Sequence, residues 1–414
     1  TPVLDLSHYS YTISAAGLDI RNVTYVKFRG LTIRNNKQKV VNQWISGLQF
    51  YQCGNLWVDQ MVEYGSNGYG IWFSGFDTLY LTNCDSYNNL DSLSTERGNR
   101  ADGFQISAGG SETDTFKYAV IAGNRAWNNC DDGMEISISK QFEAYNNWMF
   151  NNGKYEYGAG VGFKFGPSNV RTPGKRKFHH NLAAFNKGSA FADQNLTSTN
   201  EGPVCEMSNN TSYKCGFGFT SDPNMFNCNA GYGKVIYRNN LVYQSTYSAH
   251  FDQIYLTACN YEYPTYSIQD HNTWVPISNS PYWTYNNAVD WSYTDIIANN
   301  FELTDAAQGM AQLMNERKED GSLPDITFLK LRSTSELIDA GTDVGLGFNG
   351  TAPDLGAWEC EYQPGTSNLY PTIYFTGPSN GRIFETGSAI TITAEAEDAD
   401  GFISKVEFFA GSEK

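Results

Sequence analysis

The sequence predicts an all-β protein: a parallel β-helix over residues 1–362, a linker over 363–370 and part of an antiparallel β-sandwich over 371–414. Two observations favour the β-helix. Asparagine-rich segments recur through the first 300 residues, and these residues include 36 of the 40 asparagines. A small residue followed by an apolar one comes after each segment. No helical pattern separates these repeats, and their period is typical of a solenoid built from short strands.

The repeat is marked by seven pairs of a small and an apolar residue. Their first members are 23, 33, 30, 29, 28 and 28 residues apart, and the pairs are Gly47-Leu48, Gly70-Ile71, Gly103-Phe104, Gly133-Met134, Gly162-Phe163, Ala190-Phe191 and Gly218-Phe219. In a parallel β-helix, equivalent positions of successive coils stack about 4.8 Å apart. Asparagine at a bend can bond the asparagine of the next coil and tolerates left-handed backbone, so a structural role accounts for nearly all the asparagines.

The C-terminal third contains different elements. An amphipathic stretch from Thr304 to Lys318 predicts a helix with Thr304 as N-cap. After Pro364-Gly-Thr-Ser, the segments 373–375, 389–396 and 406–409 alternate like antiparallel strands, with Asp398-Ala-Asp-Gly401 as a turn. This part resembles the bacterial immunoglobulin-like modules of secreted polysaccharide enzymes. Because 44 residues make about half of such a sandwich, we expect a truncated C-terminus.

Composition excludes several classes of protein. The chain has 28 Lys+Arg against 44 Asp+Glu, a net charge of −16, so a generic nucleic-acid binder is not expected. No apolar run approaches the roughly 20 residues of a membrane helix. The eight cysteines form no CxxC pair, which argues against zinc, and the trio Cys205, Cys215 and Cys228 fits either a disulfide or buried thiols.

The composition fits an exported protein, and we expect a secreted or cell-surface monomer from a bacterium. No signal peptide is visible, because Thr1-Pro-Val-Leu-Asp already reads as a strand. The N-terminal coils are therefore expected to have been cut away.

Charged residues fall into register when each coil is counted from its glycine. Asp102 and Asp132 directly precede Gly103 and Gly133, and Asp131 lies beside the second. Glu135 and Lys164 each lie two residues after their glycine, between apolar residues that point inward, so their side chains point outward. Four acids on two adjacent coils repel one another unless a cation neutralises them, and an all-oxygen ligand set favours calcium over zinc or copper.

At these residues the chain resembles polysaccharide lyase family nine. The family pattern is Asp-Gly-Phe, then Asp-Asp-Gly-Trp-Asp one coil later, then Gly-Phe-Lys; here it reads Asp102-Gly-Phe, Asp131-Asp-Gly-Met-Glu135 and Gly162-Phe-Lys164. Glu135 stands where the family usually has Asp, and Met134 where it often has Trp.

The resemblance implies a right-handed parallel β-helix and a calcium-dependent lyase that cleaves 4-linked galacturonate polymers of pectin by β-elimination. It also implies that Asp102, Asp131, Asp132 and Glu135 bind Ca²⁺ and that Lys164 is the Brønsted base.

Basic residues concentrate near this motif. Twelve of the 28 Lys+Arg lie between Arg97 and Lys187. Guanidinium and ammonium groups bind carboxylates, so five of them are candidates to bind an acidic polysaccharide substrate: Lys154, Arg171, Lys175, Arg176 and Lys187. The run from Arg171 to Lys177 is expected in a loop, either as a groove wall or as an ordinary solvated loop.

Three alternatives remain open. The Glu135 departure favours rhamnogalacturonan I or another uronate polymer as substrate. A β-helical polygalacturonase has an Asp-Asp pair but also Gly-His-Gly and Arg-Ile-Lys elements, which this sequence lacks. A non-enzymatic β-helix that binds carbohydrate, with calcium joining its coils, fits the acids but gives Lys164 no role.

Overall fold

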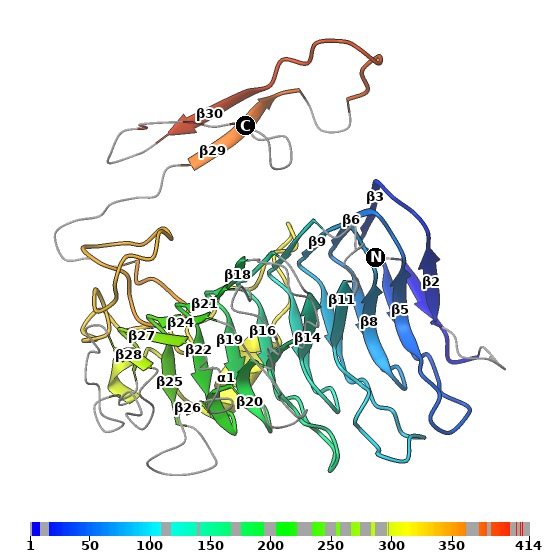
Figure 1. Ribbon diagram of the computed structural model, residues 1–414, viewed down its shortest axis with the longest axis horizontal. Helices are drawn as coiled ribbons and strands as arrows, with labels where there is room; N and C mark the ends of the chain where they lie inside the picture. The colour runs from blue at the N-terminus through cyan, green and yellow to red at the C-terminus, as the bar shows by residue number, and fades with distance from the viewer. Residues whose placement is uncertain are drawn as a thin grey trace.

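The computed structural model describes residues 2–8, 16–108, 117–138, 141–166, 175–193, 204–221, 234–244, 254–256, 266–273, 283–285, 296, 298–361, 372–378, 382–397, 403, 406 and 408. Within these residues the strands up to Tyr285 form three parallel sheets, here called I, II and III, and each coil contributes to them in turn. Figure 1 shows the coils stacked along the long axis of the solenoid in chain order, from blue to green. The predicted β-helix is confirmed.

Sheet I carries the small-apolar pairs. Its strands, in stacking order, are β2 (Leu18–Arg21), β5 (Ser46–Tyr51), β8 (Tyr69–Ser74), β11 (Phe104–Ala108), β14 (Met134–Ile138), β17 (Phe163–Phe165), β20 (Ser189–Asp193), β23 (Phe217–Ser221) and β26 (Ile254–Leu256). The apolar members of all seven predicted pairs are aligned in one column from Leu48 to Phe219. The predicted register is therefore confirmed.

Sheets II and III complete each coil. Sheet II contains β3 (Val26–Arg29), β6 (Asn55–Asp59), β9 (Thr78–Thr82), β12 (Tyr118–Ala122), β15 (Phe142–Tyr145), β18 (Lys175–His179), β21 (Val204–Ser208), β24 (Lys234–Arg238), β27 (Tyr266–Asp270) and β28 (Trp283–Tyr285). Sheet III contains β1 (Val3–Asp5), β4 (Thr32–Arg34), β7 (Val62–Tyr64), β10 (Asp85–Tyr87), β13 (Arg125–Trp127), β16 (Trp148–Phe150), β19 (Leu182–Ala184), β22 (Thr211–Tyr213) and β25 (Leu241–Tyr243).

Two columns of buried asparagines run along the solenoid. At the turn from sheet II to sheet III, each amide nitrogen donates to the side-chain oxygen of the next coil at 2.9–3.0 Å, through Asn124, Asn147, Asn181, Asn210, Asn240 and Asn272. A second column, Asn89, Asn129, Asn152 and Asn186, occupies the turn from sheet III to sheet I. The residue before each ladder asparagine takes left-handed backbone, as Asn146 does with φ 52°. Both predicted roles of asparagine are confirmed, on neighbouring residues.

The C-terminal segment 298–361 packs against the outer face of sheet III. It contains the 3-10 helix η2 (Ala298–Asn300) and helix α1 (Ala306–Leu313). A second apolar cluster joins outward side chains such as Trp148 and Tyr213 to Phe301, Leu313 and Phe328 of this segment. This covering explains why the later strands of sheet III, β13 to β25, bury their outer side chains as well as their inner ones.

Helix α1 begins and ends differently from the prediction. Its N-cap is Asp305 and not Thr304, because the Asp305 carboxylate accepts the free N–H of Gln308 at 2.8 Å. The helix ends at Leu313, where Arg125 donates to the carbonyl oxygens of Leu313 and Asn315 at 3.0 and 2.7 Å. The expected continuation to Lys318 is therefore wrong.

The C-terminal module shows an antiparallel pair, β29 (Thr372–Gly377) with β30 (Thr393–Glu397). Of the third expected strand, 406–409, residues 407 and 409 lie outside the described residues. The structure does not join Cys205 to Cys215, which are both buried, and Cys228 lies outside the described residues. Among the described residues, no helix has the length and apolar character needed to cross a membrane.

Candidate active site

Lys164 and Glu135 lie opposite each other on sheet I. Glu135 of β14 pairs with Lys164 of β17, and both side chains point outward because Met134, Ile136, Phe163 and Phe165 fill the interior. The Lys164 ammonium lies 2.8 Å from Glu135 Oε2 and 3.2 Å from Asp132 Oδ2. The sequence predicted this register, and the structure adds the second contact.

Three aspartates gather beside this pair. Asp102, Asp131 and Asp132 each place a carboxylate oxygen within 4.8 Å of the other two, and they are only 3 %, 6 % and 0 % exposed. We call these three residues the aspartate group. Glu135 is not part of the group: besides Lys164, its carboxylate accepts hydrogen bonds from Gln105 at 3.3 Å and Ser137 at 3.1 Å.

Backbone N–H groups hold one oxygen of each aspartate. Asp102 accepts from the N–H of Asp132 at 3.0 Å, Asp131 from that of Ala159 at 2.7 Å, and Asp132 from that of Val161 at 2.7 Å. These donors belong to the turn from sheet III to sheet I of the following coil. The turn requires glycine: a Cβ on Gly133 would lie 2.8 Å from the carbonyl oxygen of Gly162. The predicted Asp-Gly motif thus has a steric cause in the stacking of coils.

The carboxyl groups of the aspartate group raise one another's pKa. Burial raises the pKa of Asp102 and of Asp131 well above the usual range, and neighbouring carboxylates raise both further. Burial on its own lowers the pKa of Lys164, but the charges of Asp132, Glu135 and Asp102 outweigh it and raise that pKa overall. When ionised, three buried carboxylates facing one ammonium carry an excess of negative charge. Such an oxygen-only ligand set suits a hard cation, so the aspartate group has the chemistry of a metal site.

The predicted substrate-binding residues do not form one group. Lys154 is exposed in the turn between β16 and β17, which also contains the N–H donors Ala159 and Val161, and it donates to Asn151 at 2.7 Å. Lys187 donates at 2.8–3.1 Å to the carbonyls of Tyr155, Glu156 and Gly158, so it holds the turn that supplies Ala159 and Val161.

The run from Arg171 to Lys177 was expected in a loop, and this is wrong for the part that the structure describes. Lys175 and Arg176 lie in strand β18 of sheet II, not in a loop. Lys175 pairs with Glu206 at 2.9 Å. Arg176 is 0 % exposed, in the same inward alternation as Phe178, and therefore cannot contact a polysaccharide. Arg171 lies outside the described residues.

Two aromatic residues next to the site, Tyr69 and Trp72, were not singled out from the sequence. Trp72 of β8 belongs to the outward column that continues through Gln105 and Glu135 to Lys164. Tyr69 precedes Gly70, as Asp102 precedes Gly103, and packs against Trp44 and Trp72. The same glycine register would have identified both residues.

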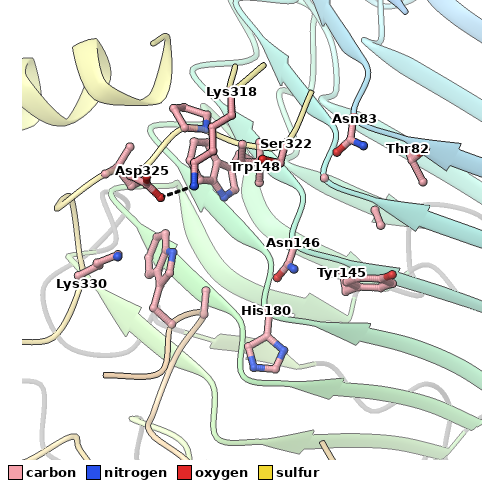
Figure 2. A pocket seen from close by; sticks show the side chains of 17 residues that line it. Thr82, Asn83, Tyr145, Asn146, Trp148, His180, Lys318, Ser322, Asp325 and Lys330 are labelled. Carbon is pink, nitrogen blue, oxygen red and sulfur yellow. Dashed lines mark hydrogen bonds and ion pairs between the residues drawn. The ribbon is translucent and has the colours of Figure 1, made fainter. Parts of the chain in front are cut away.

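A cavity of about 500 Å³ lies elsewhere, between the coils and the C-terminal segment. Figure 2 shows Asn146 and His180 on its solenoid side and the Lys318–Asp325 ion pair, at 2.6 Å, on the other. No member of the aspartate group lines this cavity, and Lys164 does not either. Its charges are a surface ion pair and Lys330, so it lacks the convergent carboxylates that the aspartate group provides.

Fold and site together define the chain as a pectate-lyase-like polysaccharide lyase. It belongs to the Pel9A-like right-handed β-helix family, whose pattern matches residues 1–248, and residues 371–414 match the bacterial Ig domain. The recognition of family and terminal module from the sequence is thereby confirmed.

Two curated relatives are both called pectate lyase L. The protein from Dickeya chrysanthemi is 28 % identical over 357 residues, and that from Dickeya dadantii (strain 3937) 28 % over 353; each alignment covers 77 % of this chain and 70 % of the relative. Two solved structures share the fold. The crystal structure of pectate lyase Pel9A has a TM-score of 0.59 at 23 % identity, over 86 % of this chain and 76 % of that one. A rhamnogalacturonan lyase has a TM-score of 0.61 at 20 % identity, over 80 % and 76 %.

Proposed function

We propose that the chain cleaves 4-linked galacturonate-containing pectic polymers by calcium-dependent β-elimination, with Lys164 as the base. The observation that carries this proposal is the position of Lys164 Nζ, 2.8 Å from Glu135 and 3.2 Å from Asp132 at the edge of the aspartate group. The names of the two Dickeya relatives support the substrate class.

The residues of the chain supply the proton transfer. The proton on C5 of a 4-linked uronate is weakly acidic, and neutral Lys164 removes it. The C5–H electron pair forms the C4–C5 double bond, the C4–O bond breaks, and the leaving sugar oxygen takes a proton from water. Because the base must be the uncharged amine, activity is expected to rise towards alkaline pH.

The aspartate group fits the metal that this reaction needs. Asp102, Asp131 and Asp132 would hold Ca²⁺, with Glu135 as a fourth ligand on the adjoining side. When bound, Ca²⁺ neutralises these carboxylates and draws charge from the C6 carboxylate of the substrate, which makes the C5 proton more acidic. The backbone N–H groups of Asp132, Ala159 and Val161 orient the three carboxylates beforehand.

Other residues have supporting roles in the proposal. Lys154, exposed in the turn beside the aspartates, is the foremost candidate to bind a substrate carboxylate. Lys187 acts through the turn that it holds. Lys175 of sheet II stays a candidate, as does Arg171, which lies outside the described residues, and Arg176 is withdrawn because it is buried. We also propose that the enzyme is a monomer exported by a bacterium, in agreement with its bacterial relatives and its bacterial Ig module.

The test is absorbance near 235 nm, where unsaturated uronates absorb, on polygalacturonate and on rhamnogalacturonan I at about pH 9. Product is expected with calcium and not with chelator, and Lys164→Ala should form none. Lys177→Ala is the matched control, because this lysine also pairs with a glutamate, Glu143 at 3.7 Å, but on sheet II.

The two polymers distinguish the candidate substrates. Glu135, longer than the aspartate usual at this position, favours rhamnogalacturonan I or another uronate polymer as the alternative. Product from rhamnogalacturonan I alone would replace the pectate assignment and keep the chemistry. No product from either, with calcium still raising the melting temperature, would indicate a different uronate polymer as substrate or a non-enzymatic carbohydrate-binding protein with a structural metal.

A further inference from the structure

A group of aromatic side chains lies on the N-terminal side of the aspartate group. The ring of Tyr69 lies 5.8 Å from that of Trp44 and 5.3 Å from that of Trp72. We call Trp44, Tyr69 and Trp72 the aromatic platform. The guanidinium of Arg100 lies 4.4 Å from the centre of the Trp44 ring, at the edge of this platform.

The platform is aligned with the proposed catalytic centre. Trp72 pairs with Gln105, Gln105 with Glu135, and Glu135 with Lys164, all in the outward column of sheet I. Three coils at the usual strand spacing put Trp72 about 14 Å from Lys164 along the solenoid. A polysaccharide that follows this column from Lys164 therefore reaches the platform.

Ordinary ladder packing does not explain these rings. Most aromatic residues stacked in register on the described strands have nearly parallel rings, as in Trp57–Tyr80 at 4° and Tyr64–Tyr87 at 9°. The two platform pairs are tilted by 42° and 47° instead. Trp44 also comes from the segment between β4 and β5, not from a strand, and it is 48 % exposed.

Burial raises the pKa of Asp91 and the charge of Arg100 opposes that rise, but Arg100 makes no direct ion pair in the described part of the chain. It is half-buried, and among the described residues no carboxylate lies within ion-pair distance of it; its printed hydrogen bond is to the carbonyl of Asn42, at 3.4 Å. In a chain with a net charge of −16, such an arginine is notable. Its planar group can bind a carboxylate through two hydrogen bonds, while indole faces suit the apolar face of a sugar ring.

We propose that the aromatic platform and Arg100 form a sugar-binding subsite, which holds one residue of a polyuronate about three coils from Lys164. Trp72 and Trp44 contact the apolar face of the sugar ring, and Arg100 binds its carboxylate. The subsite rests on the proposed function, because it requires a polyuronate aligned with Lys164. It makes the enzyme favour long substrates over short ones.

The test measures binding by calorimetry, with calcium, in the Lys164→Ala protein, so that the probe is not cleaved. The probes are saturated hexagalacturonate and digalacturonate, or the same lengths of rhamnogalacturonan I if the wild type cleaves only that polymer. Trp72→Ala and Arg100→Gln should each weaken binding of the hexamer about tenfold and leave the dimer unchanged. Trp57→Ala, an exposed tryptophan stacked on Tyr80 of sheet II, should change neither.

A kinetic readout in the otherwise wild-type chain complements the binding. Trp72→Ala should raise KM for the polymer and leave kcat unchanged, and Trp72→Phe should recover part of the loss. If the hexamer binds Trp72→Ala and Arg100→Gln as tightly as the parent, the subsite is refuted while the proposed function stands. If the wild type neither cleaves nor binds either polymer, both proposals fail. Arg100→Gln is informative even if Trp72→Ala does not fold.

Discussion

The Lys164 ammonium lies 2.8 Å from the Glu135 carboxylate, and the two residues face each other across adjacent strands of sheet I. A lysine held in this way is fixed in position and strongly favours its charged form. The pair therefore stabilises the protein in the absence of cation and substrate. The proposed reaction requires Lys164 to lose its proton, so that this pair no longer carries opposite charges.

Lys164→Arg distinguishes the role of Lys164 as a base from its role in the ion pair. Arginine keeps the charge that faces Glu135 and Asp132, but it does not lose its proton in a protein. We expect kcat to fall by about 10²- to 10⁴-fold, measured at 235 nm, with little change in melting temperature. Lys177→Arg should retain full activity. An active Lys164→Arg enzyme would mean that another group is the base.

Asp131→Asn should have opposite effects with and without calcium. In chelator, it removes one of three mutually repelling buried carboxylates, so the melting temperature should rise. In the parent, calcium at 100 times its Kd should stabilise the fold by about 2.7 kcal/mol, and the variant should lose this gain. Differential scanning calorimetry measures both. An unchanged response to calcium in the variant would show that the ion binds elsewhere.

Glu63 makes stability depend on pH. It is fully buried and accepts hydrogen bonds from Ser66, Ser86 and Asn89, yet burial raises its pKa to about 7. The folded protein favours the protonated acid. The contribution of Glu63 to the free energy of unfolding is therefore fully present below about pH 4.5 and is lost as the pH rises through 7. The rise in pKa corresponds to about 3 kcal/mol.

Glu63→Gln removes this dependence. The variant should be more stable than the parent above pH 7 and equal to it below about pH 4.5, by urea denaturation at each pH. Glu143→Gln is the control of opposite sign, since a hydrogen bond from His179 lowers the pKa of Glu143 and the substitution should destabilise at neutral pH. If the parent proves more stable at pH 8 than the Glu63→Gln variant, the role assigned to Glu63 is contradicted.

Asp85 joins the C-terminal segment to the coils. Its carboxylate lies 2.8 Å from Arg125 and 2.7 Å from Arg317, and all three side chains are largely buried. Asp85→Asn leaves two arginines without their acid, and we expect a loss of about 3–5 kcal/mol in the free energy of unfolding. Lys318→Ala breaks only the exposed pair with Asp325 and should cost no more than about 1 kcal/mol. Equal losses would exclude the buried network as the main attachment.

Substitution of two adjacent asparagines should change the stability of the protein by different amounts. Asn147 is buried in the ladder between Asn124 and Asn181, so Asn147→Ala should cost about 1–3 kcal/mol by leaving ladder partners unsatisfied. Asn146 is exposed and has φ 52°, which glycine adopts without strain, so Asn146→Gly should be nearly neutral. Thermal unfolding of the two variants compares them directly.

The sequence was most informative where stacking restricts side chains. The sheet I register, the aspartate group and the Lys164–Glu135 pair could be predicted, because successive coils repeat a small residue, usually glycine, at the same place. Charge alone misled at Arg176, which alternates with the inward Phe178 and is buried. The role of Lys187 could not be predicted, since its carbonyl partners belong to a turn 29–32 residues away. The path of the C-terminal segment along sheet III has no local signal at all.

The C-terminal segment bonds to coils at widely separated levels of the solenoid. Gln60 donates to the Asp320 carbonyl near one end, while Asn209 and Asn239 donate to the carbonyls of Asp354 and Thr342 towards the other. A repeat protein whose coils contact only their neighbours can unravel from an end, one coil at a time. Here the segment couples distant coils to one another, so partial unravelling would also break contacts far from the end, and we expect the enzyme domain to unfold in one cooperative step.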